Sequence, residues 1–382
     1  MNVPFNFFDT VPRDCWLDID ACQLAENVRR LQAAIGRPLL VAVKANGYGH
    51  GYEIAAKAFL KGGAKYLGVA NYGEGLLLRK LGITAPILLL SGLLPDEMTL
   101  AVAAGLEFFV FRPEHVEALK QMPKTASSIR VHIKVDTGMG RIGCLPEEAA
   151  AIGAELKKIP NVAVAGLATH FAIASIPDND HTNGQIEKFD RVIVSLAAIG
   201  IRPEIIHAAN SSGALYHPRA RYDMARVGMV AYGVPPSSFV GPDIPVGVKT
   251  ALTWKARITS TKILPAGASV SYGCEYVMPK EGRVGILPVG YGDGYFRIPK
   301  NVNSVLVGGH ECKTVGRINT DQCVIDLDDM PDMTGAEVVL LGQQGESEIP
   351  VQELARRWQT NTYSVYINIA PRVPRRAIGE NL

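Results

Sequence analysis

The strongest constraint on the fold is a series of eight apolar, β-branched segments that alternate with helix-like segments. The eight segments are Leu39–Lys44, Tyr66–Ala70, Ile87–Ser91, Leu106–Phe111, Ile129–Asp136, Val162–His170, Glu204–Ala209 and Val227–Tyr232. Between them, stretches such as Tyr52–Leu60 and Gln185–Ile199 carry apolar residues at helical spacing. Strands that alternate with helices pair in parallel, and eight such units close on themselves. The pattern therefore predicts an α/β fold with a (β/α)8 TIM barrel.

The sequence changes character after this series. Proline, glycine and serine between residues 235 and 245 break any regular element. Short β-like runs follow, separated by turn residues, with one helical stretch at 351–358. We therefore expect an N-terminal extension at 1–14, the barrel at 15–240 and a mostly β C-terminal domain at 241–382. An early strand at 15–20 is expected to pair with the β domain.

Composition narrows the functional classes. With 47% hydrophobic residues, 20% charged residues and a formal net charge of +2, the chain has no basic surface excess that would suggest nucleic acid or membrane as a partner. The six cysteines show neither a C-x-x-C pair nor zinc-ligand spacing, so we expect no disulfide framework and no metal. Residues 1–14 lack the basic and apolar regions of a signal peptide, which predicts a cytoplasmic protein.

The first predicted barrel strand ends in Lys44, which runs directly into the glycine-rich stretch 45–51. In such barrels the chemistry lies at the carboxyl ends of the strands. A lysine there can form a Schiff base when desolvation and neighbouring cations lower its pKa. A lone lysine at a strand end is more often ion-paired, so the Schiff-base interpretation of Lys44 depends on the residues around it.

The fifth predicted strand alternates polar and apolar residues, which places Arg130, His132, Lys134 and Asp136 on one face. If helices cover the outside of the barrel, this polar face is the interior. Burying these groups is costly unless they pair with one another or serve a site. Both explanations, a functional site and a structural ion-pair network, remain open from the sequence.

Further polar residues end strands six to eight. His170 ends strand six, Ser211 and Ser212 follow strand seven, and Arg226 and Gly228 belong to strand eight. Loops after strands seven and eight of these barrels commonly bind a phosphate through backbone N–H groups. Taken singly, the serines are more often helix N-caps, and a histidine such as His170 is more often a core residue.

At this point the chain resembles a known family. Residues 43–51, Val-Lys-Ala-Asn-Gly-Tyr-Gly-His-Gly, resemble the pyridoxal-phosphate lysine motif of alanine racemases. Further blocks resemble that family in its order, at 134–141, 169–171, 209–211, 226–228, 270–273, 290–294 and 372–375. The resemblance spans nearly the whole chain. It implies a pyridoxal 5'-phosphate-dependent alanine racemase that supplies D-alanine for peptidoglycan and works as a homodimer with shared active sites.

The resemblance also implies roles for individual residues. Lys44 would be the Schiff-base lysine and one catalytic base, and Tyr272 of the partner subunit would be the other. Arg141 and the backbone of Thr320 would contact the substrate, and Lys134 matches a lysine that is carbamylated in many members. The cofactor would be held by Lys44, Tyr48, His170, Asn210, Ser211, Arg226, Gly228, Met229 and Tyr363.

Two of these roles concern the cofactor ring. Arg226 matches the arginine that faces the pyridine nitrogen, and His170 matches the histidine that links this arginine to Tyr272.

The chain departs from the family pattern at two places. Asn319 and Thr320 stand where the family usually has Cys-Met, and Ser175 stands where an aspartate is common. Strict specificity for alanine is therefore open, and a racemase of serine or of several amino acids is an alternative.

Two further alternatives share the barrel. A decarboxylase of the same fold usually supplies a cysteine from its second domain, whereas this chain offers Tyr272. A non-catalytic pyridoxal-phosphate carrier resembles the barrel alone, so the long segment after residue 240 argues against it.

Overall fold

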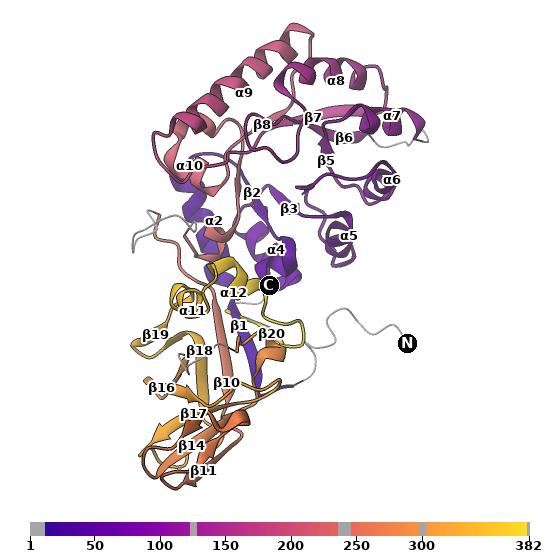
Figure 1. Ribbon diagram of the computed structural model, residues 1–382. Helices are drawn as coiled ribbons and strands as arrows, with labels where there is room; N and C mark the ends of the chain where they lie inside the picture. Colours follow the sequence, from indigo (N-terminus) through magenta and orange to yellow (C-terminus); the bar gives the residue numbers. More distant parts are fainter. Residues whose placement is uncertain (1–11, 123–127, 236–245, 298–302, 380–382) are drawn as a thin grey trace. The chain divides into compact units, whose positions relative to one another are not determined.

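The computed structural model describes residues 12–122, 128–235, 246–297 and 303–379 (Figure 1). Most of the predicted N-terminal extension, and most of the proline-rich break at 235–245, lie outside these residues. The chain forms two compact units. Of the described residues, those within 23–47 and 55–249 form the barrel unit, and those within 12–22, 48–54 and 250–379 form the β unit.

Eight short parallel strands form the centre of the barrel unit. They are β2 (Leu39–Ala42), β3 (Tyr66–Val69), β4 (Ile87–Leu89), β5 (Phe108–Val110), β6 (Ile129–Lys134), β7 (Val162–Ala168), β8 (Ile205–His207) and β9 (Ala225–Val227). Their order is β9-β2-β3-β4 and β5-β6-β7-β8, and a parallel bridge between Leu88 and Glu107 joins the two runs. The Arg226 N–H donates to the Ala209 carbonyl at 2.9 Å and closes the ring between β8 and β9. The predicted α/β barrel is confirmed.

Helices alternate with these strands along the chain, beginning with one helix before β2 (Figure 1). They are α2 (Ala21–Ile35), α4 (Tyr52–Lys61), α5 (Tyr72–Lys80), α6 (Pro95–Ala103), α7 (Pro113–Gln121), α8 (Ala149–Leu156), α9 (Asp180–Ala198) and α10 (Ser211–Tyr216). Helix α9 shows why these segments are helical. Its buried residues Ile186, Phe189, Val192 and Leu196 recur every three or four positions and form one apolar face. The Asn179 side chain caps its first turn by accepting from two backbone N–H groups.

The eighth strand is shorter than the sequence predicts. The predicted segment Val227–Tyr232 is a strand only at its first residue, because β9 ends at Val227 and Met229–Tyr232 forms the 3-10 turn η3. Gly228 has φ −120° and ψ −119°, which no strand adopts. The prediction of a strand at Val227–Tyr232 was therefore wrong beyond its first residue, and β9 is followed by the turn η3 instead.

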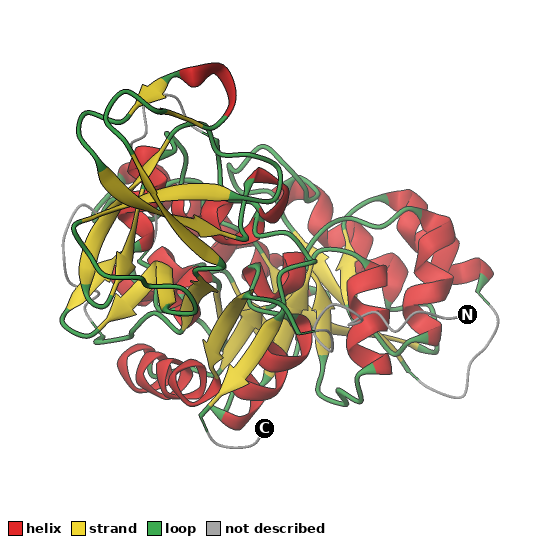
Figure 2. Cartoon of the chain, turned by 90° about the horizontal axis from the view of Figure 1, so that it is seen from below, coloured by secondary structure: helices red, strands yellow, loops and turns green. Residues whose placement is uncertain are grey.

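The β unit is a mostly antiparallel sheet, as predicted; Figure 2 distinguishes its strands (yellow) from helices (red). Its strands run in the order β11 (Ser260–Leu264), β14 (Gly282–Leu287), β17 (Cys323–Asp328), β16 (His310–Val315), β15 (Ser304–Val307), β18 (Glu337–Gln344), β10 (Leu252–Arg257), β1 (Cys15–Asp20) and β20 (Arg375–Ile378). Strand β1 pairs antiparallel with β10 and parallel with β20.

Smaller elements complete the β unit. They are the hairpin β12 (Ser269–Val270) and β13 (Tyr276–Val277), the edge strand β19 (Ser347–Ile349), helices α11 (Val351–Arg357) and α12 (Thr362–Ile367), and the turns η4 (Tyr272–Cys274) and η5 (Tyr291–Asp293). Tyr295 lies in the core of this unit, edge-to-face with Trp254 and with Trp358, at 5.7 Å between ring centroids in each pair. In the described part of the chain, no helix is long and apolar enough to cross a bilayer.

A buried amide ties α2 to the end of the barrel unit. The Asn27 side chain is fully buried and donates to the carbonyls of Ala231 and Lys249 at 3.0 and 2.8 Å. Its oxygen accepts from the Lys249 N–H at 3.0 Å. One buried side chain therefore binds three backbone groups, of which the Ala231 carbonyl is itself buried.

We predict that Asn27→Ala lowers the free energy of unfolding by about 2 kcal/mol, because three hydrogen bonds are lost and the buried Ala231 carbonyl loses its partner. Urea titration followed by circular dichroism measures the change. Glu26→Ala, on the exposed side of the same helix, is the matched control and should leave the midpoint nearly unchanged. Equal midpoints for the two variants would contradict the assignment.

Candidate active site

Five cationic or titratable side chains meet at the carboxyl ends of the barrel strands. Lys44 follows β2, Lys134 ends β6, Arg141 lies in the loop after β6, His170 follows β7, and Arg226 belongs to β9. Burial lowers the pKa of His170 well below its usual value, and the charges of the other four lower it further. The barrel unit thus collects in one place five residues that the sequence predicted separately. We call them the mouth cluster.

Lys44 is held at the start of an unusual turn. Burial, and next the charge of Arg141, lower the pKa of its amine, while Glu74 opposes them. The following residues Ala45, Asn46 and Gly47 have φ between 52° and 57° and ψ between 45° and 54°. This is a left-handed turn, which costs non-glycine residues about 1–2 kcal/mol each.

Glu74 stabilises this turn. Its carboxylate accepts from the Ala45 N–H at 2.9 Å and from the Ala70 N–H at 2.7 Å, so it joins the ends of β2 and β3. The sequence analysis missed Glu74, because a glutamate in the first turn of a helix is an ordinary feature. The carboxylate also favours the charged form of Lys44.

Lys134 is the most deeply buried lysine of the cluster, with 4% of its surface exposed. Burial, and next the charge of Arg226, lower the pKa of its amine well below the usual value. Its Nζ lies over the Phe109 ring, 5.7 Å from the centroid. The surroundings therefore favour the neutral amine.

The Arg226 side chain reaches from β9 across the closing seam to residues at the ends of β7 and β8. Its NH1 donates to the His207 carbonyl at 2.9 Å and to Nδ1 of His207 at 3.0 Å. Its NH2 donates to the carbonyls of Thr169 and Ala208, at 2.7 and 2.9 Å, and to Nδ1 of His170 at 3.0 Å. Burial, followed by the charge of Arg141, lowers the pKa of Arg226 to about 10.

The contact with His170 fixes the position of a proton. A guanidinium only donates, so Nδ1 of His170 must accept and the imidazole proton must be on Nε2. The structure therefore brings together Arg226 and His170, the pair that the sequence analysis linked.

The residues predicted to bind a phosphate lie where two short N-terminal turns meet. Asn210 is the N-cap of α10, since its Oδ1 accepts from the Gly213 N–H at 2.9 Å. The Ser211 Oγ accepts from the Gly228 N–H at 3.1 Å and joins α10 to the turn that begins at Met229. Asn210, and not a serine, is thus the cap, and the Ser211 hydroxyl keeps its own proton to donate.

Four predicted residues belong to the β unit. The rings of Tyr48 and Tyr363 pack edge-to-face with centroids 5.9 Å apart, and burial raises the pKa of Tyr363. Tyr272 begins the turn η4 and is 74% exposed. The Thr320 hydroxyl lies 2.5 Å from the hydroxyl of Tyr291.

Asp136 organises the loop that carries Arg141. Strand β6 was predicted to reach Asp136 but ends at Lys134, and the carboxylate turns to its own loop. Oδ1 accepts from the N–H groups of Gly138, Met139 and Gly140 at 2.8–3.2 Å, and Oδ2 accepts from Arg141 N–H at 2.9 Å. Four backbone N–H groups thus converge on one carboxylate.

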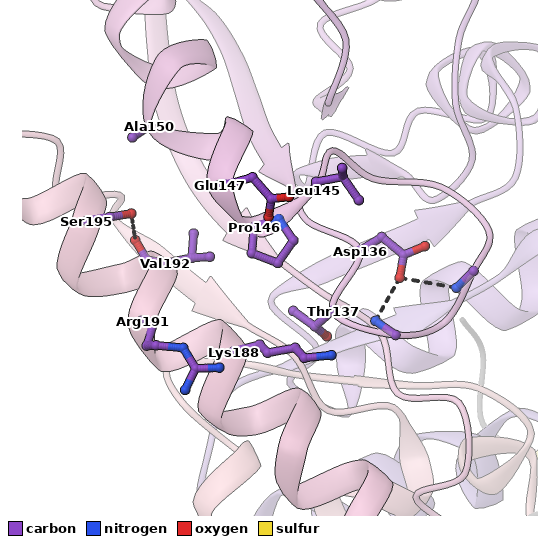
Figure 3. A pocket seen from close by; sticks show the side chains of 12 residues that line it. Asp136, Thr137, Leu145, Pro146, Glu147, Ala150, Lys188, Arg191, Val192 and Ser195 are labelled. Atoms are coloured by element: carbon purple, nitrogen blue, oxygen red, sulfur yellow. Dashed lines mark hydrogen bonds between the residues drawn. The ribbon is translucent and has the colours of Figure 1, made fainter.

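A pocket of about 740 Å³ lies beside this loop (Figure 3). The loop lines it together with the segment that leads into α8 and with Lys188, Arg191, Val192 and Ser195 of α9. Lys44, Lys134, His170 and Arg226 do not line it, so the mouth cluster is a separate feature. Within the described ranges, no group of three or more His, Cys, Asp or Glu residues could hold a metal ion.

Comparison with known proteins identifies close relatives. Residues 19–236 match the family described as alanine racemase, N-terminal domain, and residues 251–377 match the alanine racemase C-terminal domain. An alanine racemase of Symbiobacterium thermophilum is 43% identical over 96% of this chain and 98% of its own length.

Two solved structures show the same architecture. The alanine racemase of E. faecalis has a TM-score of 0.89 at 36% identity and covers 96% of this chain and 98% of its own. A histidine racemase of Leuconostoc mesenteroides has a TM-score of 0.90 at 27% identity and covers 97% of this chain and 100% of its own.

We predict that Asp136→Asn loosens the loop 137–141. The NH2 group of asparagine would replace one carboxylate oxygen, so a donor would face a backbone N–H that donates to Asp136 in the wild type. Amide hydrogen exchange should become faster there at neutral pH, and Asp96→Asn on an exposed helix surface should leave it unchanged. Burial raises the pKa of Asp136, but the four backbone N–H groups outweigh this and hold the pKa below its usual value.

The stabilisation by Asp136 is therefore complete above the ordinary aspartate pKa, about 3.9, and is lost as pH falls through the lowered value. After correction for intrinsic rates, the wild-type loop should loosen only in that acidic range. Loosening between pH 5 and 7 would contradict this.

Proposed function

Because the chain belongs to the alanine racemase family of isomerases, we propose that it interconverts L- and D-alanine with pyridoxal 5'-phosphate as cofactor. The observation that carries the proposal is the mouth cluster, in which Lys44 has a lowered pKa beside Lys134, Arg141 and Arg226. In the cell, the proposed role is to supply D-alanine for peptidoglycan in the cytoplasm.

The residues present fit this cofactor. The cluster carries an excess of positive charge, which suits a group with a phosphate and a phenolic oxygen. The Ser211 hydroxyl retains a proton to donate, and the turns of α10 and η3 begin beside it. Arg226 donates four of its five N–H groups to described residues, so its Nε–H is the donor left for the pyridine nitrogen.

Each residue has a proposed task. Lys44 would hold the cofactor covalently, and Arg226 would face the ring nitrogen. The phosphate would be bound by Tyr48, Ser211, Gly228, Met229 and Tyr363, with Asn210 capping the helix at the site. When bound, the cofactor supplies an electron sink for the negative charge that forms at the α-carbon, which no side chain can provide.

Racemisation needs proton exchange on both faces of that carbon, so two bases are required. The lowered pKa of Lys44 increases the fraction of neutral amine that can take a proton. The second base would be Tyr272 of the partner subunit. The high exposure of Tyr272 in its own chain supports a role that is completed by another copy.

Lys134 would orient the substrate indirectly. Its burial favours a neutral amine, the form that reacts with carbon dioxide to give a carbamate. The resulting negative charge would offset the cations around it and hold Arg141, which would contact the substrate carboxylate with the Thr320 N–H.

A racemase with wider specificity is the second candidate. The hydroxyls of Thr320 and Tyr291 are paired at 2.5 Å. The resemblance implies methionine at the Thr320 position, so we propose that this polar pair favours a hydroxylated substrate such as serine. Comparing kcat/KM for L-alanine and L-serine decides between the two.

We predict that the purified protein with pyridoxal 5'-phosphate converts L-alanine to D-alanine, and that Lys44→Ala and Tyr272→Phe each abolish most of this activity. Reduction with borohydride followed by peptide mapping should find the cofactor on Lys44. A cofactor bound elsewhere, or full activity without Lys44, would refute the assignment.

The shared site has its own test. Mixing the inactive Lys44→Ala and Tyr272→Phe proteins should restore activity to about a quarter of wild type, since half of the dimers then contain one complete site. If Tyr272 acts within its own chain, mixing restores nothing. Each variant refolded alone is the control.

Arg226→Glu should increase half-transamination relative to racemisation, because a carboxylate beside the ring nitrogen would stabilise its protonated form and so prolong the carbanion's lifetime. Cofactor released in the amine form measures this ratio. Arg191→Glu, on α9 away from the mouth cluster, is the control. An unchanged ratio in Arg226→Glu would count against the role of Arg226.

A further inference from the structure

Two histidines and a glutamate extend from Arg226 through the barrel interior. Nε2 of His207 lies 2.8 Å from Nδ1 of His132, and Nε2 of His132 lies 2.7 Å from Oε2 of Glu107. His132 and His207 have no exposed surface, and Glu107 is 6% exposed. The residues come from β8, β6 and the start of β5, so the chain of contacts crosses the interior away from the mouth cluster.

We propose that Glu107, His132 and His207 are positioning residues, forming a one-way hydrogen-bond chain that holds Arg226 as a donor toward the bound cofactor. The inference rests on the proposed function only in naming the cofactor as the group to which Arg226 donates. The hydrogen-bond chain itself is present in the barrel whether or not the proposed function holds.

The direction of the chain follows from its first member. Arg226 only donates, so Nδ1 of His207 accepts and its proton is on Nε2. That proton is donated to Nδ1 of His132, whose own proton must therefore be on Nε2. It is donated in turn to Glu107, which only accepts when ionised. Reversing either ring would place a donor against a donor, so only one arrangement satisfies every contact.

The far end of the chain is anchored by ionic contacts. Nε of Arg130 donates to Oε1 of Glu107 at 2.8 Å, and its two terminal nitrogens donate to Glu204 at 2.9 and 3.1 Å. Burial raises the pKa of Glu107, but its hydrogen bonds with His132 and Arg130, together with the Arg130 charge, outweigh it and lower the pKa overall. Glu107 is thus kept as the anion on which the direction depends.

The direction requires a neutral His207. Burial, and next the charge of Arg226, lower the pKa of His207 well below its usual value. A second proton on His132 would meet the Nε2–H of His207. The backbone also leaves room for this geometry, since a Cβ at Gly166 of β7 would overlap Nδ1 of His132.

The chain fixes the orientation of Arg226. With NH1 held by His207 and NH2 by His170 and two carbonyls, only Nε–H remains to donate to a ligand. If His207 turned its protonated nitrogen toward Arg226, the guanidinium would have to move. The ring nitrogen of the cofactor would then lose a fixed donor.

Two substitutions at His132 separate direction from packing. His132→Gln keeps an acceptor toward His207 and a donor toward Glu107, so it preserves the chain. His132→Phe fills the same space without either hydrogen bond. A role in filling space is met by either side chain, whereas the proposed role requires glutamine. In Gly166→Ala the added Cβ would displace Nδ1 of His132 and break its hydrogen bond with His207, although no polar residue is changed. This variant should behave like His132→Phe.

The test has two readouts. In the cofactor-free protein, 15N NMR of labelled imidazoles should find His132 and His207 neutral, each with its proton on Nε2. With cofactor bound, half-transamination relative to racemisation should rise about tenfold in His132→Phe, as expected for the loss of one hydrogen bond to a charged group. It should stay near the wild-type ratio in His132→Gln.

Either readout can overturn the proposal. A proton on Nδ1 of either histidine would contradict the proposed direction of the hydrogen bonds. Equal ratios of half-transamination to racemisation in His132→Gln and His132→Phe would show that His132 only fills space. If His132→Phe does not fold, the NMR result on the wild-type protein decides. If the wild-type protein neither binds the cofactor nor racemises, the proposed function fails, and the imidazole protons still decide the chain.

Discussion

The Arg226 guanidinium lies at the seam of the barrel, where single backbone hydrogen bonds such as Arg226 N–H to the Ala209 carbonyl join β8 to β9. It binds carbonyls that follow β7 and β8, so it replaces part of the strand pairing that the seam lacks among the described residues. The same nitrogens fix the protons of His170 and His207. Closure of the fold and polarity of the site thus depend on one side chain, and a change there affects both.

The polar face of β6 has two parts with different physical roles. Toward the start of the strand, Arg130 and His132 are compensated by Glu107 and Glu204, which is the structural network that the sequence left open. Toward its end, Lys134 lies among Arg141 and Arg226, and its amine is driven toward neutrality. Positive charge therefore accumulates at the end of the strand where an anionic ligand can balance it.

The periodicity of the sequence was sufficient to predict the barrel and the mostly β unit, because burial on both faces of parallel strands produces apolar runs. It was insufficient at Gly228, because the strand ends before this residue although the apolar sequence continues beyond it. The link from Glu107 through His132 to His207 could not be predicted from the sequence, since it joins residues up to 100 positions apart that come together only after the ring closes. Tyr272 was identified by its motif alone, because an exposed tyrosine in a turn carries no other signal.

The left-handed turn after β2 has a consequence for how this chain can evolve. Ala45 and Asn46 hold torsion angles that glycine adopts without cost, so glycine at either position would relieve strain and stabilise the protein. Glycine at these positions would also make the backbone next to Lys44 more flexible, so that the Lys44 amine would be held less firmly in one position. Thermostability and placement of the reactive amine therefore compete at these two positions, and variants selected only for heat resistance would be expected to lose turnover there first.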